Sequence, residues 1–158
     1  MTQEERDLLL KDLYARIPYG VKILHQGWNY EWDQELSTLE RVTGIDERFI
    51  YTKVINDNGE EYTSGRHTIS LCDDKPYLFP LSSMTEEQYE SLKESGILSN
   101  CSHSCEYVNP YVYGVSFRFK GFKTYSLELI EWLNKNHFDY RGLIPLGLAK
   151  DATKLNIY

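Results

Sequence analysis

The densest cluster of side chains suited to acid–base chemistry lies near the end of the chain, at 137–142: His-Phe-Asp-Tyr-Arg-Gly. Asp139 could orient His137 as general acid–base catalysis requires, and Arg141 could hold an anion. In the competing structural interpretation His137 closes the end of the preceding helix, where a cation is favourable, and Asp139 pairs with Arg141. Because structural polar networks are common, we favour the structural interpretation and predict no catalytic residue. An enzyme centred on His137, Asp139 and Arg141 is the less favoured alternative, and it predicts a pocket in which these side chains converge.

A second candidate interleaves basic and aromatic residues from 118 to 125, Arg-Phe-Lys-Gly-Phe-Lys-Thr-Tyr. This chemistry binds phosphates while stacking on bases. The competing interpretation is a solvated strand end whose aromatic side chains are buried. The predicted site for a nucleotide or other small molecule draws on both candidate segments, and its residues are Arg118, Lys120, Lys123, His137, Asp139, Tyr140 and Arg141.

Cys101, His103 and Cys105 are residue types that bind zinc. On an extended strand, however, residues i and i+4 are about 13 Å apart, so the three share an ion only if the loop curls. Cys72 precedes two aspartates, which disfavour a reactive thiolate. The sequence also has no phosphate-binding loop, dinucleotide fingerprint or hydrolase motif. We therefore predict no metal and no cofactor.

The aromatic content is high, with 13 Tyr, 6 Phe and 3 Trp. Tyrosine and tryptophan are favoured at protein interfaces because they bury much area at a modest cost in entropy. Two groups lie outside the clearest strand, one among acidic residues and one beside the 97–110 segment. They form the predicted protein interface, which consists of Trp28, Tyr30, Trp32, Tyr107 and Tyr111.

The formal net charge of −7 hides an asymmetry. Residues 1–106 hold 20 acids and 10 bases, a charge of −10, and residues 107–158 hold 4 acids and 7 bases, a charge of +3. The acidic balance argues against non-specific DNA binding and against attachment to an anionic membrane. The charged start, the lack of a long apolar run and the odd number of cysteines favour a reducing cytoplasm.

Three helices are expected, over 2–17, 85–95 and 126–136. Thr2 with Glu5, and Thr85 with Gln88, match the pattern of a capping box. Strands are expected over 21–25, 36–43, 49–55, 61–63, 67–71, 76–81 and 111–119. The 56–59 segment, Asn-Asp-Asn-Gly, predicts a turn, and 97–110 is the least regular stretch. This order predicts an α+β fold, a mostly antiparallel sheet flanked by about three helices, in a single domain over 1–158.

Three segments carry a resemblance to a known family: 16–22 (RIPYGVK), 77–87 (YLFPLSSMTEE) and 132–144 (WLNKNHFDYRGLI) followed by Gly147, Leu148 and Ala149. With these segments the chain resembles a family of small uncharacterised proteins of gut-bacterial (Bacteroides-type) phages, prophages and mobile elements. That family has no known activity, so the resemblance transfers no site residue. It implies an accessory role inside a bacterial host.

The predicted function is that of a non-enzymatic accessory protein of a phage or mobile element that binds a host or phage protein. Homo-oligomerisation is a further prediction. The alternative is a module that binds a small molecule or nucleotide at the basic and aromatic strand end over 118–125.

Overall fold

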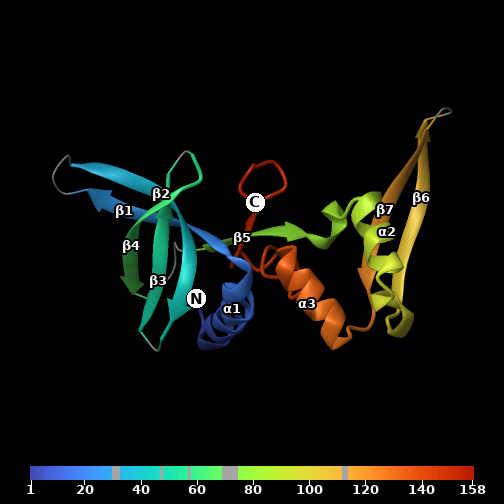
Figure 1. Cartoon of the computed structure of the whole chain (residues 1–158), viewed down its shortest axis with the longest axis horizontal. Coiled ribbons are helices and arrows are strands. Elements are labelled where there is room, and N and C mark those ends of the chain that lie inside the picture. Colours follow the sequence, from blue (N-terminus) through green and yellow to red (C-terminus); the bar gives the residue numbers. More distant parts are fainter. Residues whose placement is uncertain (30–32, 47, 57, 69–74, 112–113) are drawn as a thin grey trace. The chain divides into compact units, whose positions relative to one another are not determined.

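The computed structural model describes residues 1–29, 33–46, 48–56, 58–68, 75–111 and 114–158 (Figure 1). Over these residues it confirms the predicted α+β class, with three α-helices and mostly antiparallel strand pairing. The chain divides into two compact units. Unit 1 comprises residues 1–78 and 141–158, and unit 2 comprises residues 79–140. The single domain predicted from the sequence stays a prediction.

Unit 1 begins with helix α1 (Gln3–Arg16), and its predicted capping box is confirmed. The Thr2 hydroxyl accepts from the Glu5 amide at 3.2 Å, and the Glu5 carboxylate accepts from the Thr2 amide at 2.7 Å. These bonds satisfy amides that lack partners within the helix. A 3-10 turn, η1 (Ile17–Tyr19), then ends at Gly20, whose φ of 73° suits glycine and directs the chain into the sheet.

The sheet of unit 1 follows directly as an antiparallel series. Its strands lie in the order β4-β3-β2-β1-β5. The predicted turn between β3 and β4 is confirmed by the 2.9 Å bond from the Gly59 amide to the Asn56 carbonyl. The short strand β9 (Lys150–Asp151) pairs in parallel with β5. The bounds are β1 (Lys22–Asn29), β2 (Gln34–Ile45), β3 (Phe49–Ile55), β4 (Glu61–Thr68) and β5 (Lys75–Pro80).

The core of unit 1 lies between α1 and one face of the sheet. On β3, strict alternation buries Ile50, Thr52 and Val54, the pattern of a strand with one covered face. The other face of β1, β2 and β3 therefore presents the intervening side chains. The buried cluster combines helix and strand residues, namely Leu9, Leu13, Val21, Ile23, Val42 and Ile50.

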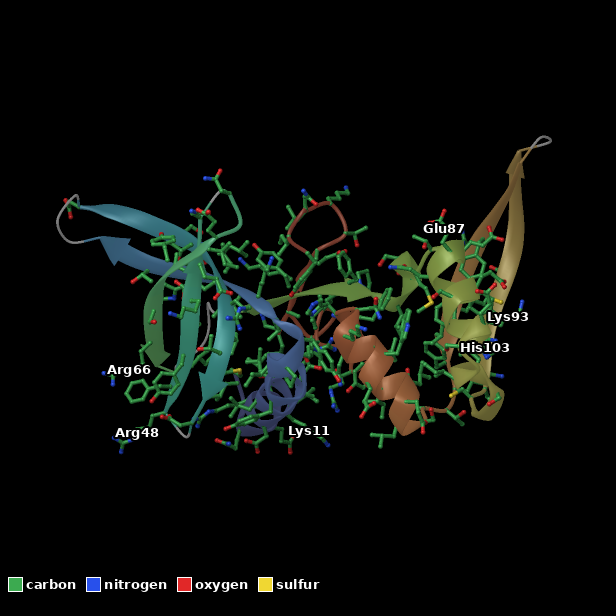
Figure 2. The ribbon with its side chains drawn as sticks, viewed as in Figure 1. Lys11, Arg48, Arg66, Glu87, Lys93 and His103 are labelled. Carbon is green, nitrogen blue, oxygen red and sulfur yellow. The ribbon has the colours of Figure 1, made fainter. Side chains whose placement is uncertain are left out.

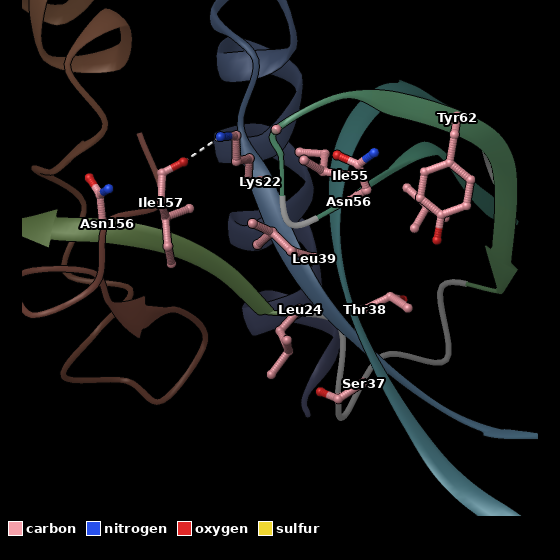
Figure 3. Close-up of a pocket in the computed structure, with 12 residues that line it drawn as sticks. Lys22, Leu24, Ser37, Thr38, Leu39, Ile55, Asn56, Tyr62, Asn156 and Ile157 are labelled. Carbon is pink, nitrogen blue, oxygen red and sulfur yellow. Dashed lines mark hydrogen bonds between the residues drawn. The ribbon is translucent and has the colours of Figure 1, made fainter.

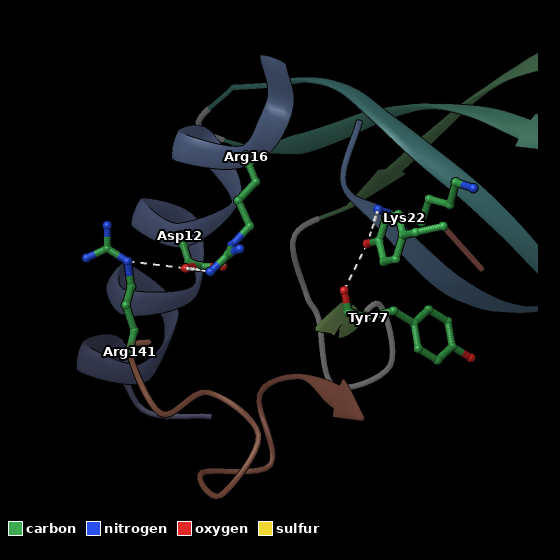
Figure 4. Close-up of polar contacts among 6 residues, drawn as sticks. Asp12, Arg16, Lys22, Tyr77 and Arg141 are labelled. Atoms are coloured by element: carbon green, nitrogen blue, oxygen red, sulfur yellow. Dashed lines mark hydrogen bonds and ion pairs between the residues drawn. The ribbon is translucent and has the colours of Figure 1, made fainter. Parts of the chain in front are cut away.

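A buried ionic cluster links α1 to the final segment of unit 1 (Figure 4). Asp12 and Arg16, one helical turn apart, are both 0% exposed, and the carboxylate accepts from Arg16 Nε at 2.7 Å and from Nη2 at 3.1 Å. Arg141 Nε donates to the same carboxylate at 3.2 Å. Two guanidinium groups thus satisfy one carboxylate that has no access to water, as a buried charge requires.

Unit 2 surrounds an aromatic core. Tyr89 and Leu92 of α2, Phe119 of β7 and Leu133 of α3 belong to one buried cluster. Its two-residue strand β8 pairs in parallel with Phe79 and Pro80. The elements are η2 (Leu81–Ser83), α2 (Glu86–Glu94), η3 (Ile97–Asn100), β6 (His103–Tyr111), β7 (Gly114–Phe122), α3 (Leu127–Lys135) and β8 (Phe138–Asp139).

The 97–110 segment, predicted as irregular, instead forms η3 and most of β6. Its polar residues do not alternate with apolar ones, so only pairing with β7 reveals it as a strand. Of the seven strand predictions, only 49–55 has the predicted bounds. The strands predicted over 21–25 and 36–43 are longer, the one over 76–81 is Lys75–Pro80, and the one over 111–119 begins at Gly114. The segments 61–63 and 67–71 are predicted as separate strands, but 61–68 forms the single strand β4, and 69–71 lie outside the described residues.

Candidate functional site

The basic strand end of unit 2 is a solvated surface. Lys120 Nζ lies 2.6 Å from a Glu106 oxygen, and Arg118 Nη1 lies 4.0 Å from the other. The Arg118 and Lys120 side chains are 66% and 50% exposed. Lys123 follows β7 and is exposed, and its amide donates to the Ser102 carbonyl. Glu106 thus contacts two of the three predicted phosphate ligands, as in the solvated interpretation.

The aromatic residues between those cations pack on the other side of the β6–β7 ribbon. Phe119 is 2% exposed, and its ring lies 4.8 Å from that of Phe122 and 6.2 Å from that of Tyr89. The Tyr89 hydroxyl lies 3.0 Å from Nε2 of His103, which is labelled in Figure 2. On β7 the exposed Arg118 and Lys120 and the buried Phe119 ring therefore lie on opposite sides of the ribbon.

The structure places the 137–141 cluster in both units. His137 and Asp139, both 7% exposed, and Tyr140 belong to unit 2, whereas Arg141 belongs to unit 1 and contacts Asp12. His137 has a φ of 57°, and its amide donates to the Asn134 carbonyl at 3.1 Å. This is the geometry of a residue that ends a helix. The Tyr140 ring packs 5.8 Å from that of Tyr125.

The predicted interface falls largely on residues of which little is described. Tyr30 and Trp32 lie outside the described residues, as does Cys72. The backbone places Trp28 in β1 and both Tyr107 and Tyr111 in β6.

The other two cysteines that entered the metal hypothesis are in unit 2. The Cys101 thiol donates to the Ile97 carbonyl at 3.5 Å. Within the described part of the chain, no group of three or more His, Cys, Asp or Glu side chains gathers as a metal site.

A groove of about 580 Å³ lies on the sheet of unit 1 (Figure 3). Half-buried aliphatic side chains of β1, β2 and β3 line it, together with the exposed ring of Tyr62. The β3–β4 turn contributes Asn56 and Gly59, and the final segment of the chain contributes Asn156 and Ile157. The remaining lining residues are Lys22, Leu24, Ser37, Thr38, Leu39, Val54 and Ile55.

Three cations form a row across the sheet, which we term the cation row, and one of them, Lys22, also lines the groove. Lys22 on β1 lies directly opposite Arg41 on β2, and Arg41 lies directly opposite Lys53 on β3. Residues opposite one another in an antiparallel pair share a face, so the three cations project from one side. Adjacent strands are about 4.8 Å apart, so the backbone positions of neighbouring cations in the row are close together.

A second row, the apolar row, lies two residues along each strand from the cation row. Leu24 follows Lys22 at that spacing and lies opposite Leu39 on β2, with Ile55 in the corresponding position of β3. Because side chains alternate along a strand, residues two apart project from the same face. The open face thus carries a positive strip next to an aliphatic strip.

Glu61 on β4 lies opposite Ile55 of the apolar row and is the carboxylate that Arg41 of the cation row binds. Arg41 donates to it from Nε, and from Nη2 at 2.9 Å. The pKa of Glu61 is lowered first by the hydrogen bond from Arg41 and further by the positive charges of Arg41, Lys53 and Lys22. The fields of all three cations therefore converge here, and a single carboxylate offsets only part of their charge.

Lys22 is held where the groove meets the end of the chain. Its Nζ donates to the Ile157 carbonyl and lies 5.3 Å from the centre of the Tyr158 ring. Burial lowers the pKa of Lys22, and the negative charge of Glu61 opposes that shift. The ammonium group therefore already lies in a partly dehydrated setting, where a bound anion interacts more strongly than in bulk water.

The Tyr158 hydroxyl fixes this corner of the groove. It accepts from the Lys22 amide at 3.1 Å and donates to the Tyr77 carbonyl at 2.9 Å. Although 40% of the residue is exposed, its hydroxyl is enclosed by these partners, and burial raises the pKa of Tyr158 to about 12. The tyrosine thus stays neutral and anchors β1 beside the groove.

The next row of the open face carries a fourth cation. Arg66 on β4, labelled in Figure 2, lies opposite Tyr51 on β3. Its guanidinium carbon is 4.5 Å from the centre of the Phe49 ring. Arg66 therefore extends the positive surface toward Phe49, where β3 begins.

Sequence reasoning missed this site, although a signal is present. Each of three successive strands carries a cation two residues from an aliphatic residue: Lys22 and Leu24, Leu39 and Arg41, Lys53 and Ile55. The order reverses on the middle strand, as an antiparallel neighbour requires for the rows to align. Searching the separate strands for this alternation would have predicted both rows.

Comparisons with protein families, with curated proteins and with solved structures gave no match. Among the described residues, no helix is long and apolar enough to cross a membrane.

Proposed function

We propose that the chain is a non-enzymatic binding module whose unit 1 groove holds an anionic ligand with an apolar part. The observation that carries this proposal is the cation row of Lys22, Arg41 and Lys53 on three adjacent strands. Like charges directly opposite one another destabilise a sheet. An anion in the groove would offset that repulsion, and the neighbouring aliphatic row would take the apolar part.

The composition of the groove supports binding in preference to proton transfer. Its described lining residues supply an ammonium group, hydroxyls and amides, but no carboxylate or imidazole. Those two groups, which most often serve as general acids and bases, are absent from that lining. The volume also lies in the range of about 300–1,000 Å³ typical of small-molecule sites.

Calorimetric titration with inorganic pyrophosphate at low salt tests the proposal. We expect binding that Lys53→Ala weakens at least about fivefold, since about 1 kcal/mol of charge interaction is lost. Lys120→Ala is the matched control, because it removes the same side chain and the same charge from the solvated ribbon of unit 2. No heat of binding with the wild type, or equal weakening by both substitutions, would contradict the proposal.

The biological setting belongs to the same proposal. We place the module in the bacterial cytoplasm as an accessory protein of a phage or mobile element, on the strength of the three resembling segments at 16–22, 77–87 and 132–149.

A second candidate function, binding of a host or phage protein, is favoured by the open edge of the unit 1 sheet. β4 lies at the end of the strand order and, among the described strands, pairs only with β3. Glu61, Tyr62, Thr63 and Ser64 are exposed along it. An unpaired strand edge offers backbone donors and acceptors to an extended segment of another protein.

Proline substitution tests this second candidate. Thr63→Pro and Ser64→Pro each remove one amide, and one of these two amides points outward because they alternate along the strand. The outward variant should keep the fold and lose a copurifying partner or a self-associated dimer in sedimentation. Retention of the partner by both variants would eliminate strand addition.

A further inference from the structure

The distance between the two rows bears on the kind of anion that the groove takes. Two residues along a strand span about 6.6–6.8 Å, so this distance separates the cation row from the apolar row on β1, β2 and β3. A ribose spans a similar gap between a base and its 5′-phosphate. A bare inorganic anion would contact the cation row alone and leave the apolar row uncovered.

The apolar row offers a flat surface for a ring. Leu24 and Leu39 lie opposite each other and are half-buried, so their side chains form a low floor instead of projecting into solvent. Tyr62 is 64% exposed and lines the same groove. Stacking of a base on an exposed aromatic side chain contributes about 1–3 kcal/mol. The floor and the ring together suit a planar, mostly apolar body.

The cation row provides two different kinds of phosphate ligand. Arg41 is fixed by its two hydrogen bonds to Glu61, which orient the guanidinium group. Lys22 and Lys53 stand on either side of it in the register. Lysine acts as a point charge and arginine as an oriented fork. A phosphate over Arg41 would therefore have the Lys22 and Lys53 ammonium groups on the neighbouring strands.

The size and lining of the groove bear on the length of the ligand. Residues of the β3–β4 turn, Asn56 and Gly59, line it together with Asn156 and Ile157 of the final segment (Figure 3). Proteins that bind single strands without sequence preference instead use grooves that follow the backbone over several nucleotides. A groove of about 580 Å³, within the size range of small-molecule sites, favours a single nucleotide over a polymer.

From these observations we infer that the ligand of the groove is a nucleoside phosphate. Its base lies on Leu24 and Leu39 against Tyr62, and its phosphate lies on Lys22, Arg41 and Lys53. This inference rests on the proposed function, because it assigns the ligand class of the same groove.

Calorimetry with a graded series of probes tests the inference. The four nucleoside 5′-monophosphates, ribose 5-phosphate, the four nucleosides and an eight-residue oligothymidylate are titrated into the full chain. At least one monophosphate should bind at least about tenfold more tightly than ribose 5-phosphate, since stacking adds about 1.4 kcal/mol or more. The corresponding nucleoside should bind at least about tenfold more weakly than its monophosphate, since it lacks the charge.

Two variants assign the contacts. Tyr62→Ala should weaken the monophosphate at least about fivefold and leave ribose 5-phosphate within about twofold, since it removes the stacking ring alone. Lys53→Ala should weaken both, and Lys120→Ala neither. Tyr62 is exposed, so its substitution is compatible with folding, which circular dichroism checks.

The possible outcomes distinguish failure of the nucleoside phosphate inference from failure of the proposed anion binding. Equal affinity for ribose 5-phosphate and the monophosphates would overturn the nucleoside inference and leave anion binding intact. Tighter binding of the oligothymidylate would overturn the single nucleotide in favour of a nucleic acid strand. Failure of every probe, pyrophosphate included, would remove both the inference and the proposed function.

Discussion

The two units place their charges differently. In unit 1 the ionic groups lie within or against the packed structure: Asp12 and Arg16 are fully buried, and the cation row adjoins an aliphatic floor. In unit 2 the core is aromatic, and Arg118 and Lys120 stand on the solvated side of a two-stranded ribbon. The difference shows that cations close together in sequence can lie on a solvated strand surface. Cations far apart in sequence can be brought into one row by strand register.

The largest expected difference in unfolding free energy is between removing a buried carboxylate in unit 1 and removing an exposed one in unit 2. Asp12→Ala would leave Arg16 buried without its carboxylate, and such a change costs about 3–5 kcal/mol. Glu106→Ala removes a partner from a solvated ion pair and should cost less than about 1 kcal/mol. Urea denaturation followed by circular dichroism measures both. Similar losses for the two variants would contradict the contrast between the units.

Charge reversal compares the two groups of cations as binding sites. Lys53→Glu should weaken pyrophosphate binding at least about tenfold, about 1.4 kcal/mol, because it replaces an attraction by a repulsion in a partly dehydrated groove. Lys120→Glu should leave the dissociation constant within about twofold at 0.15 M salt, where the Debye length is about 8 Å. The reverse order of effects would transfer the site to the ribbon of unit 2.

The next comparison is the loss of stability when one tyrosine hydroxyl is removed from each unit. Tyr158→Phe removes the bonds to the Lys22 amide and the Tyr77 carbonyl, at a cost of about 1 kcal/mol near neutral pH. Tyr125→Phe in unit 2, where the ring packs beside Phe122 and Tyr140, should cost less.

The stability difference between wild type and Tyr158→Phe should also depend on pH. Burial raises the folded-state pKa of Tyr158 to about 12. The contribution of the neutral Tyr158 hydroxyl to the free energy of unfolding is fully present below the usual tyrosine pKa. It is lost as the pH rises through about 12. The difference between wild type and Tyr158→Phe should therefore shrink on alkalinisation, and a difference that grows would rule out the enclosed hydroxyl.

The smallest effect concerns Glu61. Its folded-state pKa is lowered, chiefly by the hydrogen bond from Arg41. The stability it contributes is therefore present above the usual glutamate pKa and is lost as the pH falls through the lowered value. In an NMR titration, Arg41→Gln should raise the pKa of Glu61 toward the usual value. An unchanged pKa would show that Arg41 does not hold this carboxylate.

Local signals in the sequence predicted most of the secondary structure. The capping boxes at Thr2 and Thr85 and the turn at 56–59 follow from short-range hydrogen bonds, and the structure confirms all three. Strand β6 escaped prediction because its residues do not alternate and its pairing with β7 is a tertiary feature. Local propensity thus predicted the helices and one turn more accurately than it predicted how the strands pair.

The candidate groove escaped prediction for a related reason. Lys22, Arg41 and Lys53 are 19 and 12 residues apart in the chain, as their numbering shows, and meet only through strand register. The 118–125 segment attracted the prediction because its cations lie within six residues of one another, yet alternation along β7 separates Arg118 and Lys120 from the buried Phe119 ring. A linear cluster on a strand therefore divides between two faces, whereas a row across strands shares one.

Chemical-shift mapping tests the central claim most directly. The ¹⁵N-labelled full chain is titrated with pyrophosphate, and the backbone amides of both units are followed together. We expect progressive, saturable shifts centred on Lys22, Arg41 and Lys53, with little change at Arg118, Lys120 and Lys123. Saturable shifts centred on 118–123, with Lys22, Arg41 and Lys53 unmoved, would contradict it.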